Sequence, residues 1–423
     1  MPARPAAAVR VVVLAIGLLA GKARIATAAE TITLDQALER ADAENPEIKA
    51  AVAELRAAEG RRVGAATIPY NPELGVGLGP SFVGPAFEGG KTTLYAYEAS
   101  LSQRLELGGK RSKRTSAALS QQEAARLRLD WTRWRVQAQA RRAYRLAIVA
   151  RERLATTEQG QAVARELVDA ARQRVELGAG TQLELNVAVA TEGRARQEQR
   201  VAAQRLRQAR AELAAAMAAP AGAELEPVGG LPQIAAPAIG EPEFVARALQ
   251  RRGDVAADQR EVDAARARRD LARAQAVPDV SLGVTYGRDA VDAANNVLFG
   301  VSIPIPLWNR NQGGRIEAGA DLARAETVAD AARREAERDA RTAYGNFGQA
   351  SEAVAGFDRD VIERLAQNLE LARESFRSGK IGLLVFNVVR RDLVETRLAY
   401  LDALAGLVEA GYALELASGG SVE

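Results

Sequence analysis

Residues 68–79 read IPYNPELGVGLG, and residues 277–287 read VPDVSLGVTYG, a second copy of the same pattern. Another landmark, ARQRVELG at 171–178, has its counterpart in ARESFRSG at 372–379. The first pair is offset by 278 − 69 = 209 residues and the second by 379 − 178 = 201. Because a period of about 200 residues is too long for a solenoid unit, the pattern indicates duplication of a whole half-protein.

Each copy of the repeat opens a pair of segments with the alternation of membrane β-strands. Apolar residues alternate with small or polar residues from Leu94 to Leu105 and from Val297 to Ile305. Runs of about ten residues with period two are typical of transmembrane barrel strands. We therefore expect one strand pair at about 72–105 and another at about 279–306. Two soluble β-hairpins on a helical body are the alternative.

The rest of the chain predicts very long helices. Residues 111–177 contain no proline and only one glycine, Gly160, which allows a rod of about 100 Å. Residues 315–378 also lack proline and allow a rod of about 96 Å. A stripe with coiled-coil spacing follows at Val394, Leu398, Leu401, Ala405, Val408 and Tyr412.

The first 29 residues have the pattern of a signal peptide. Arg4 and Arg10 precede an apolar run at 11–20, and Ala26-Thr27-Ala28 matches a cleavage site. Residues 1–29 carry four basic residues and no acid, so the net charge of +3 becomes 3 − 4 = −1 after cleavage. A mature chain of this charge gives no support to nucleic-acid binding.

The remaining chain divides into two halves around a linker. We expect a first half at 30–218 with a helical tip near 178–181, a Pro/Gly-rich equatorial linker at 219–242, and a second half at 243–416 with a tip near 379–382. Residues 417–423 form a C-terminal tail. Single helices are expected at 34–65 and 243–276. Thr181 and Glu184 have the spacing of a capping box, which predicts the start of the returning helix.

The composition argues against enzymatic chemistry. The chain contains no His and no Cys, which removes imidazole- or thiol-based catalysis, soft-metal sites and disulfides. Acidic and basic residues are interspersed along the helices, as on solvated faces. We expect no enzyme, no catalytic residue, no cofactor and no metal site.

Four strands cannot close a barrel by themselves. Open strand edges in lipid leave backbone groups unpaired, at several kcal/mol each. Association of several copies around an axis is the simplest solution, with the helical rods continuing along that axis.

The chain resembles the TolC-type outer-membrane efflux ducts over essentially its whole mature length. GAGTQLELNVA at 178–188 is similar to the family's hairpin tip, whereas Gly382 and Val385 depart from the usual second tip. PIPLWNRNQGG at 304–314 is similar to a turn in the heavy-metal branch, ducts of cobalt–zinc–cadmium type RND pumps. This strand-to-helix turn is represented by Pro304, Pro306, Asn309, Arg310, Asn311 and Gly313.

The resemblance implies a mainly α-helical, duplicated TolC-like fold. Four strands per protomer join a trimeric outer-membrane β-barrel of about twelve strands, and coiled-coil helices form a periplasmic α-barrel. It also implies a Gram-negative outer membrane, a homotrimer, a periplasmic adaptor and an inner-membrane RND pump. The resemblance further implies a passive duct that carries divalent heavy-metal cations. A drug or protein-export duct of the same fold is the alternative.

Two sets of residues become candidate sites under this interpretation. The helical tips that dock the adaptor contain Gly178, Gly180, Thr181, Glu184, Gly379 and Lys380. Charges beside the second tip that form a gate are Arg373, Glu374, Arg377, Arg390, Arg391 and Asp392. For the tips the alternative is simple helix capping, and for the charges it is a solvated surface.

Two other classes of protein fit less well. A coiled-coil adhesin with a barrel anchor would carry that anchor at one terminus, whereas these strand pairs interrupt both halves. A periplasmic adaptor would need a β-rich or lipoyl-like half, and no such segment is found.

Overall fold

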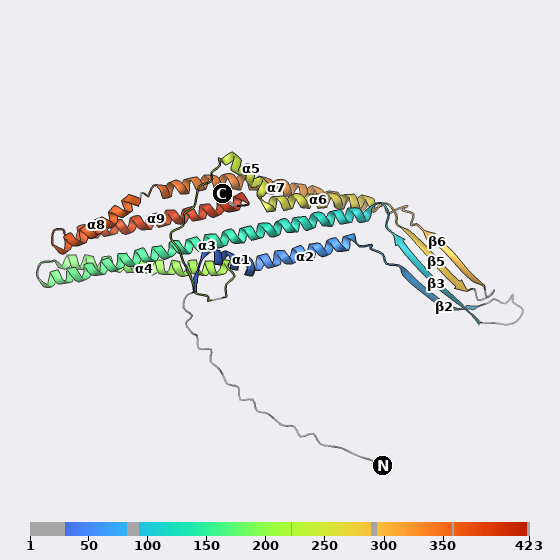
Figure 1. Cartoon of the computed structure of the whole chain (residues 1–423), viewed down its shortest axis with the longest axis horizontal. Coiled ribbons are helices and arrows are strands. Elements are labelled where there is room, and N and C mark those ends of the chain that lie inside the picture. Colours follow the sequence, from blue (N-terminus) through green and yellow to red (C-terminus); the bar gives the residue numbers. More distant parts are fainter. Residues whose placement is uncertain (1–29, 83–92, 221, 289–293, 358, 421–423) are drawn as a thin grey trace, which may run out of the picture.

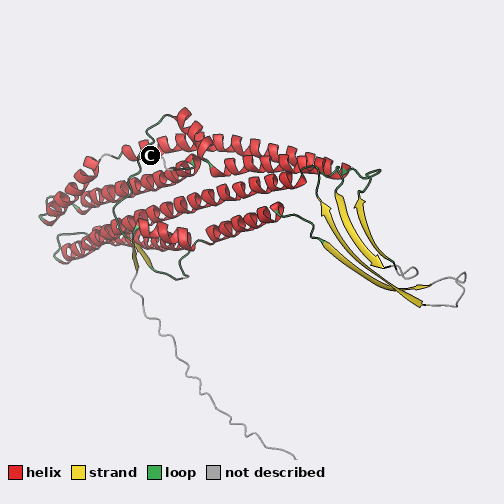
Figure 2. Cartoon of the chain, turned by 45° about the vertical axis from the view of Figure 1, so that its right-hand side comes forward, coloured by secondary structure: helices red, strands yellow, loops and turns green. Residues whose placement is uncertain are grey.

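The computed structural model describes residues 30–82, 93–220, 222–288, 294–357 and 359–420. The predicted signal peptide and the last three residues of the predicted tail lie outside the described residues. The chain forms an elongated rod, with long helices at one end and a curved sheet at the other (Figure 1). Both helical tips point away from the sheet (Figures 1 and 2).

The two halves repeat the same order of elements. The first half consists of β1 (Glu30–Ile32), α1 (Leu34–Glu44), α2 (Pro46–Ala66), β2 (Glu73–Phe82), β3 (Thr93–Leu105), α3 (Lys110–Glu176) and α4 (Gln182–Ala216). After β4 (Leu225–Pro227), the second half consists of α5 (Glu241–Arg251), α6 (Gly253–Ala274), β5 (Val280–Arg288), β6 (Asn295–Ser302), α7 (Gln312–Ala355), α8 (Arg359–Arg377) and α9 (Leu383–Ser418). The fold class predicted from the sequence, mainly helical with two strand pairs between the helices, is therefore confirmed, and β1 and β4 are two further short strands.

One antiparallel sheet combines the strand pairs of both halves, in the order β2-β3-β5-β6. β3 and β5 join the halves, with Leu101 opposite Val284. β2 and β6 are left at the edges, and no other strand of the described residues pairs with them.

Helices expected to be continuous are broken at equivalent places in the two halves. Asn45 separates α1 from α2 and has φ −61° and ψ 126°, because the residue before a proline avoids the helical region. Arg252 separates α5 from α6 with a similar backbone, φ −62° and ψ 112°. An added Cβ at Gly253 would lie 2.9 Å from the Leu127 carbonyl oxygen, so α6 begins in close contact with α3.

The rod predicted at 315–378 is also interrupted. α7 ends at Ala355 and α8 begins at Arg359. Gly356 caps α7, and the ring of Phe357 packs edge-on against Tyr400 of α9, with ring centroids 5.8 Å apart. Glycine is a poor helix former, and this aromatic contact holds the departing chain. At the other end of this half, α9 includes Ala417 and Ser418, two residues assigned to the tail.

The equatorial linker contributes one strand, β4, to a small parallel sheet that the sequence did not predict. β1 pairs with β4 from Glu30 opposite Leu225 to Ile32 opposite Pro227. The buried Tyr144 hydroxyl of α3 lies within hydrogen-bonding distance of the Ile32 and Val228 carbonyls, can donate to either of them, and so attaches this sheet to the long helix.

Alanine side chains form much of the contact between the long helices. Ala140, Ala147 and Ala164 of α3 are fully buried, as is Ala257 of α6. Small side chains at such contacts allow close approach of helix axes. The two hairpins, α3 with α4 and α8 with α9, therefore pack as a narrow bundle (Figure 2).

Candidate functional site: sheet faces, joint and helical tips

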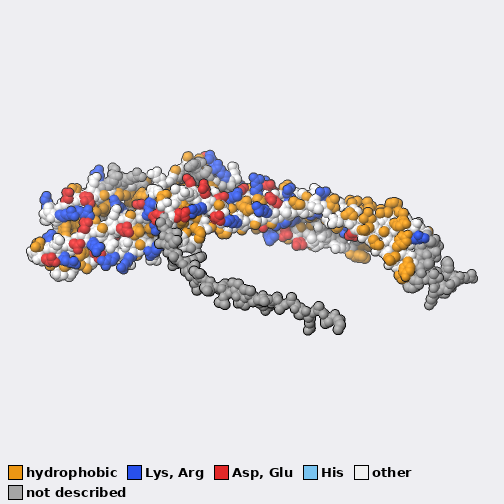
Figure 3. Space-filling model, turned by 60° about the horizontal axis from the view of Figure 1, so that its bottom comes forward, with side chains coloured by type: hydrophobic (Ala, Val, Ile, Leu, Met, Phe, Trp, Pro, Cys, Tyr) orange, Lys and Arg blue, Asp and Glu red, His pale blue; other side chains and the backbone are white. Residues whose placement is uncertain are grey.

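One face of the four-stranded sheet is apolar and exposed. The register places Leu74 opposite Leu101 and Val284 opposite Phe299. Val76 is 77% exposed and Phe299 82%. The apolar side chains of this face include Leu74, Val76, Leu78, Tyr95, Tyr97, Ala99, Leu101, Leu282, Val284, Tyr286, Val297, Phe299 and Val301, and its polar members, toward the ends of the strands, are Gln103, Arg288 and Asn295. Figure 3 shows hydrophobic side chains gathered at this end of the molecule. An apolar area of this kind is suited to a lipid environment.

The opposite face is small and polar. It contains Gly75, Gly77, Gly79, Ala96, Glu98, Ser100, Ser102, Ser281, Gly283, Thr285, Gly287, Asn296, Gly300 and Ser302, with the charged Glu73 and Arg104 at its helix-side end. Among the side chains that the structure describes on this face, Leu298 is the large apolar exception. An added Cβ at Gly75 would lie 2.7 Å from Ser100 Oγ. This face therefore keeps its side chains short and presents polar groups to water. None of the described helices combines the length and apolarity needed to cross a bilayer.

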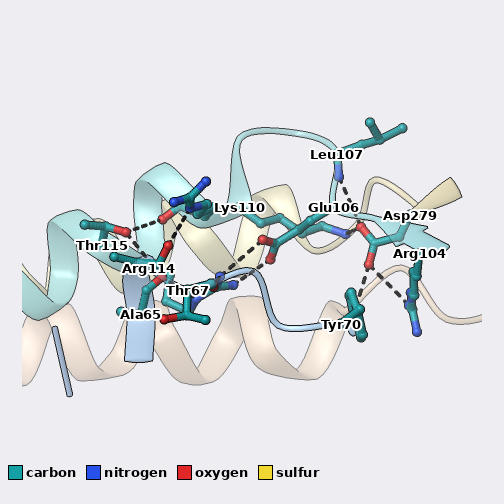
Figure 4. A network of polar contacts seen from close by, with 12 residues as sticks. Ala65, Thr67, Tyr70, Arg104, Glu106, Leu107, Lys110, Arg114, Thr115 and Asp279 are labelled. Carbon is teal, nitrogen blue, oxygen red and sulfur yellow. Dashed lines mark hydrogen bonds and ion pairs between the residues drawn. The ribbon is translucent and has the colours of Figure 1, made fainter. Parts of the chain in front are cut away.

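A buried carboxylate joins the sheet to the helices (Figure 4). Asp279, 5% exposed, lies at the start of β5. Its carboxylate accepts from Lys110 Nζ at 2.6 Å, the Leu107 amide at 3.2 Å and the Tyr70 hydroxyl at 3.5 Å. Arg104 forms an ion pair with it at 3.2 Å. Tyr70 and Asp279 are separated by 209 residues, the repeat offset, so equivalent positions of the two halves meet here.

The pKa of Asp279 results from opposing effects. Burial raises this pKa. Hydrogen bonds from Lys110 and the Leu107 amide, together with the charges of Lys110 and Arg104, lower it by more than burial raises it. The pKa of this carboxyl therefore lies below its ordinary value, and Asp279 is ionised at neutral pH.

Basic side chains also hold the C-terminal end of α2 against α3 (Figure 4). Arg111 Nε donates to the Ala66 carbonyl at 2.6 Å, and Arg114 Nε donates to the Ala65 carbonyl at 3.0 Å. Arg114 is itself paired with Glu106 at 2.6 Å. The last carbonyls of a helix have no partner within that helix, so these contacts satisfy them. Together with the Asp279 contacts they form the joint of the molecule.

The turn from β6 to α7 contains the residues predicted for the strand-to-helix turn, and at its centre Asn311 has a left-handed backbone conformation. Asn311 has φ 58°, and its Nδ2 donates to the Ala272 carbonyl at 2.9 Å. The backbone N–H of Asn311 donates to Asn309 Oδ1 at 3.0 Å, and Arg310 Nε donates to the Pro306 carbonyl at 3.2 Å. Pro304 follows the end of the strand. Gly313 has open space around it.

Gly314 is the spatially constrained glycine of this turn. A Cβ there would lie 2.5 Å from Asn311 Oδ1. The sequence prediction named its neighbour Gly313, because the two consecutive glycines could not be distinguished without the position of the Asn311 side chain.

The two helical tips have the same hydrogen-bond pattern although their sequences differ. At the first, the Gly178 amide donates to Val175 and the Ala179 and Gly180 amides donate to Arg174. At the second, Gly379 donates to Phe376, while Lys380 and Ile381 donate to Ser375. Both Gly178 and Gly379 have φ +72°, a conformation that favours glycine.

The returning helices start differently. The predicted capping box is present at the first tip, where Thr181 Oγ1 accepts from the Glu184 amide and Glu184 accepts from the Thr181 amide. Gly180 is closely packed, since an added Cβ would lie 2.9 Å from Arg174 Cβ. Gly382 starts α9 without any side-chain cap. The exposed Leu183 and Leu384 lie just beyond the two starts.

The charges beside the second tip do not form one surface cluster. Glu374, Arg377, Arg391 and Asp392 are exposed. Arg391 lies 3.7 Å from Asp392 and 3.7 Å from Glu395.

Arg373 and Arg390 face the packed helices instead. Arg373 pairs with Glu166 of α3 at 3.3 Å. Arg390 is 7% exposed, and its guanidinium donates to the Gly160 carbonyl at 3.4 Å. Burial lowers its pKa. Arg390, predicted as a gate charge, is therefore buried against α3, because helical periodicity turns this residue toward that helix.

Residues 37–219 and 244–420 match the family described as outer membrane efflux protein. The chain belongs to this family.

Known proteins similar to this efflux protein cover nearly all of it. The cobalt-zinc-cadmium resistance protein CzcC of Cupriavidus metallidurans is 28% identical over 392 residues, with 92% of this chain and 90% of CzcC covered. The pyoverdine export outer membrane protein OpmQ of Pseudomonas putida is 28% identical over 426 residues, covering 92% and 86%. The solved outer-membrane channel OprN superposes with a TM-score of 0.75 at 21% identity, covering 92% and 90%.

Several sequence predictions are confirmed by these comparisons. The protein is a transport duct of TolC-like fold and not an enzyme. It is an outer-membrane protein of a Gram-negative bacterium, with a large periplasmic portion. Sequence reasoning missed the joint of this efflux protein. The one available signal was that Tyr70 and Asp279 occupy equivalent places in the repeat but differ in chemistry.

Proposed function

We propose that the efflux protein is the passive, trimeric outer-membrane duct of a tripartite RND system and carries divalent heavy-metal cations to the exterior. The observation that carries the proposal is an apolar sheet with two unpaired edges, β2 and β6, in a chain similar to CzcC over nine-tenths of its length. In lipid, each unpaired backbone group on those edges costs several kcal/mol. Pairing β6 of one protomer with β2 of the next removes that cost, and three protomers form a barrel of about twelve strands.

The metal assignment is supported by the similarity to CzcC. The chain itself contains neither His nor Cys, so the soft ligands that select such metals are absent from its sequence. Selection then belongs to the inner-membrane pump, and the duct supplies a water-filled path. Export of a small organic molecule is the second candidate, favoured by the similarity to the pyoverdine exporter OpmQ. The family assignment leaves the adhesin alternative without support.

Partner docking is assigned to the two helical tips. Their turns are narrow, are built on left-handed glycines, and lie at the end of the molecule farthest from the sheet (Figure 1). Each has an exposed leucine beside it, Leu183 or Leu384. A helical hairpin of a periplasmic adaptor can pack against such tips through apolar contacts, and the adaptor links the duct to the pump.

Two measurements test the proposal. The mass of the detergent-extracted protein is expected to be three times that of the protomer, and a monodisperse, detergent-free monomer would refute the duct. Deletion of the gene is expected to lower the concentration of zinc, cobalt or cadmium that cells tolerate, with recovery on complementation. Unchanged metal tolerance together with lost siderophore export would favour the second candidate.

A further inference from the structure

Arg390 of α9 is a buried charge without a counter-charge. It is 7% exposed, and no carboxylate of the described residues forms an ion pair with it. Its guanidinium donates to the Gly160 carbonyl and to Asn387 Oδ1, both at 3.4 Å, and its Nε has no hydrogen-bond partner. Hydrogen bonds between ionised groups are shorter, about 2.7–2.9 Å. An arginine stays charged inside a protein, so this one lacks the partner that a buried charge needs.

Charges farther away do not compensate Arg390. Those that act on it are Glu198 and Arg194 of α4 and Glu395 and Arg391 of α9, two of each sign. Glu198 is exposed to solvent, and Glu395 lies 3.7 Å from Arg391. The positive charge of Arg390 is therefore left to whatever occupies the space next to its side chain.

That space is a cavity of about 210 Å³ between α3, α8 and α9, with Arg390 in its wall. Gly160, the single glycine of α3, also lines it. An added Cβ at Gly160 would lie 3.1 Å from Val394 Cγ2 and 3.8 Å from Arg390 Nη1, so a larger residue there would crowd both side chains. The cavity has room for a tetrahedral oxyanion with several waters.

A second guanidinium, that of Arg397, lines the same cavity. Its Nη1 donates to Gln159 Oε1 at 3.2 Å, and none of the carboxylates that the structure describes pairs with it. Gln159 and Gly160 are neighbours on α3, so the guanidiniums of Arg390 and Arg397 approach one point of that helix from two turns of α9. The acidic residue in the lining, Glu370, is 65% exposed and pairs with a different arginine at 2.9 Å.

We propose that this cavity is an anion site in which Arg390 and Arg397 bind a small inorganic oxyanion of the phosphate class. The planar fork of a guanidinium matches two oxygens of such an ion. The bound ion supplies the counter-charge that Arg390 lacks, and it holds the second hairpin against the long helix α3. All three helices belong to one protomer, so the inference does not depend on the proposed trimer.

The test is the binding of radiolabelled inorganic phosphate to the detergent-extracted full chain, by equilibrium dialysis at constant ionic strength. Wild type is expected to bind one phosphate per protomer. Arg390→Met keeps a long side chain without the charge and is expected to bind none. It is expected to fold, because replacing a buried charge by an apolar side chain is often neutral or stabilising.

Unfolding midpoints give a second readout. Phosphate at about 100 times its dissociation constant raises the folding equilibrium constant of a binding protein about 100-fold. Phosphate also stabilises proteins generally through exclusion from their surface, which affects all variants alike. The midpoint is therefore expected to rise more steeply with phosphate in wild type than in Arg390→Met.

Two further arginine variants complete the test. Arg172→Gln removes an exposed arginine of α3 and is expected to bind phosphate as wild type does. Arg397→Gln is expected to weaken binding about tenfold or more, because one charged hydrogen bond is lost, and it decides the question if Arg390→Met does not fold. Wild type that binds no phosphate, or equal binding by wild type and both cavity variants, would overturn this inference and leave the proposed efflux function untouched.

Discussion

At the residue scale, Asp279 is the single side chain on which the joint depends. It contacts Lys110, Arg104, Tyr70 and the Leu107 amide, and these come from β3 and from the segments before β2 and after β3. Lys110 is 7% exposed. Removing one partner of a buried pair leaves the other charge uncompensated, which costs more than the pair itself contributes.

We expect Asp279→Asn to destabilise the folded protein by about 3 kcal/mol, because Lys110 is left buried without a counter-charge. The unfolding midpoint in detergent measures this loss. Glu59→Gln, at an exposed carboxylate of α2, is the matched control and should change stability by no more than about 0.5 kcal/mol. The double variant Lys110→Met with Asp279→Leu should recover most of the loss. An unaffected midpoint in Asp279→Asn would show that the joint does not depend on this charge.

The lowered pKa of Asp279 also predicts a pH dependence. A carboxyl whose folded pKa lies below its unfolded value, about 3.9, contributes stability that is complete above that value. The contribution is lost as the pH falls through the folded pKa, so acid should weaken the joint below about pH 4. Unfolding midpoints measured from pH 7 to pH 3 should fall more steeply for wild type than for Asp279→Asn. Parallel curves for the two proteins would argue against the assignment.

At the element scale, the sheet has an apolar face and a polar face. Val284 and Thr285 are neighbours in β5 but lie on opposite faces, so the same substitution at each position tests which face meets lipid. Val284→Arg places a charge on the apolar face, at a cost of about 2–4 kcal/mol near the bilayer centre. Thr285→Arg places the same charge on the polar face. The outer-membrane fraction should contain much less Val284→Arg than wild type and a near-normal amount of Thr285→Arg. Equal loss of both variants would contradict the assignment of the two faces.

The helical tips give a second prediction at this scale. Gly178→Val and Gly379→Val force a branched residue to φ +72°, at a cost of about 1–2 kcal/mol confined to the turn. Insertion and oligomeric mass should persist, while export should be lost because the docking turns are distorted. Gly193→Val, in open space on α4, should leave export intact. Failure of the tip variants to reach the membrane would make these glycines structural and remove them from the docking site.

Sequence periodicity predicted the elements that are long and locally determined. The absence of proline indicated α3, and alternation indicated β3 and β6, because these signals extend over nine residues or more. Three-residue strands such as β1 are too short to show a period. The break at Arg252 comes from contact of α6 with Leu127 of α3, and the joint brings Lys110 to a carboxylate 169 residues away. Such tertiary contacts leave no local pattern.

At the scale of the whole molecule, the tip charges become significant only when copies meet around an axis. The exposed Glu374 has no ion-pair partner among the described residues, and Asp392 has only Arg391 at 3.7 Å. Both carboxylates are therefore available to basic residues of a neighbouring protomer. We propose that these links hold the tips together and that adaptor docking releases them.

Neutralising both acids, Glu374→Gln with Asp392→Asn, should open the tips. We expect higher single-pore conductance in planar bilayers and greater sensitivity of cells to large antibiotics. Removing two carboxylates elsewhere, with Glu44→Gln and Glu59→Gln, controls for the change in net charge. Conductance equal to wild type in the tip variant would show that Glu374 and Asp392 are ordinary solvated charges and do not hold the tips together.

α3 runs without a break for 67 residues, from the joint to the first tip. A helix of that length is about 100 Å long. Its N-terminal end is held at the joint by the Lys110–Asp279 ion pair, so a rotation there moves the far end by a large distance. Each degree of rotation about the joint displaces the far end by about 1.7 Å at this length. A rotation of a few degrees, too small to disturb the sheet, therefore displaces the tip by about the width of a water molecule or more. In the proposed trimer, we therefore expect the width of the periplasmic opening to respond to side chains at the membrane end that never touch it.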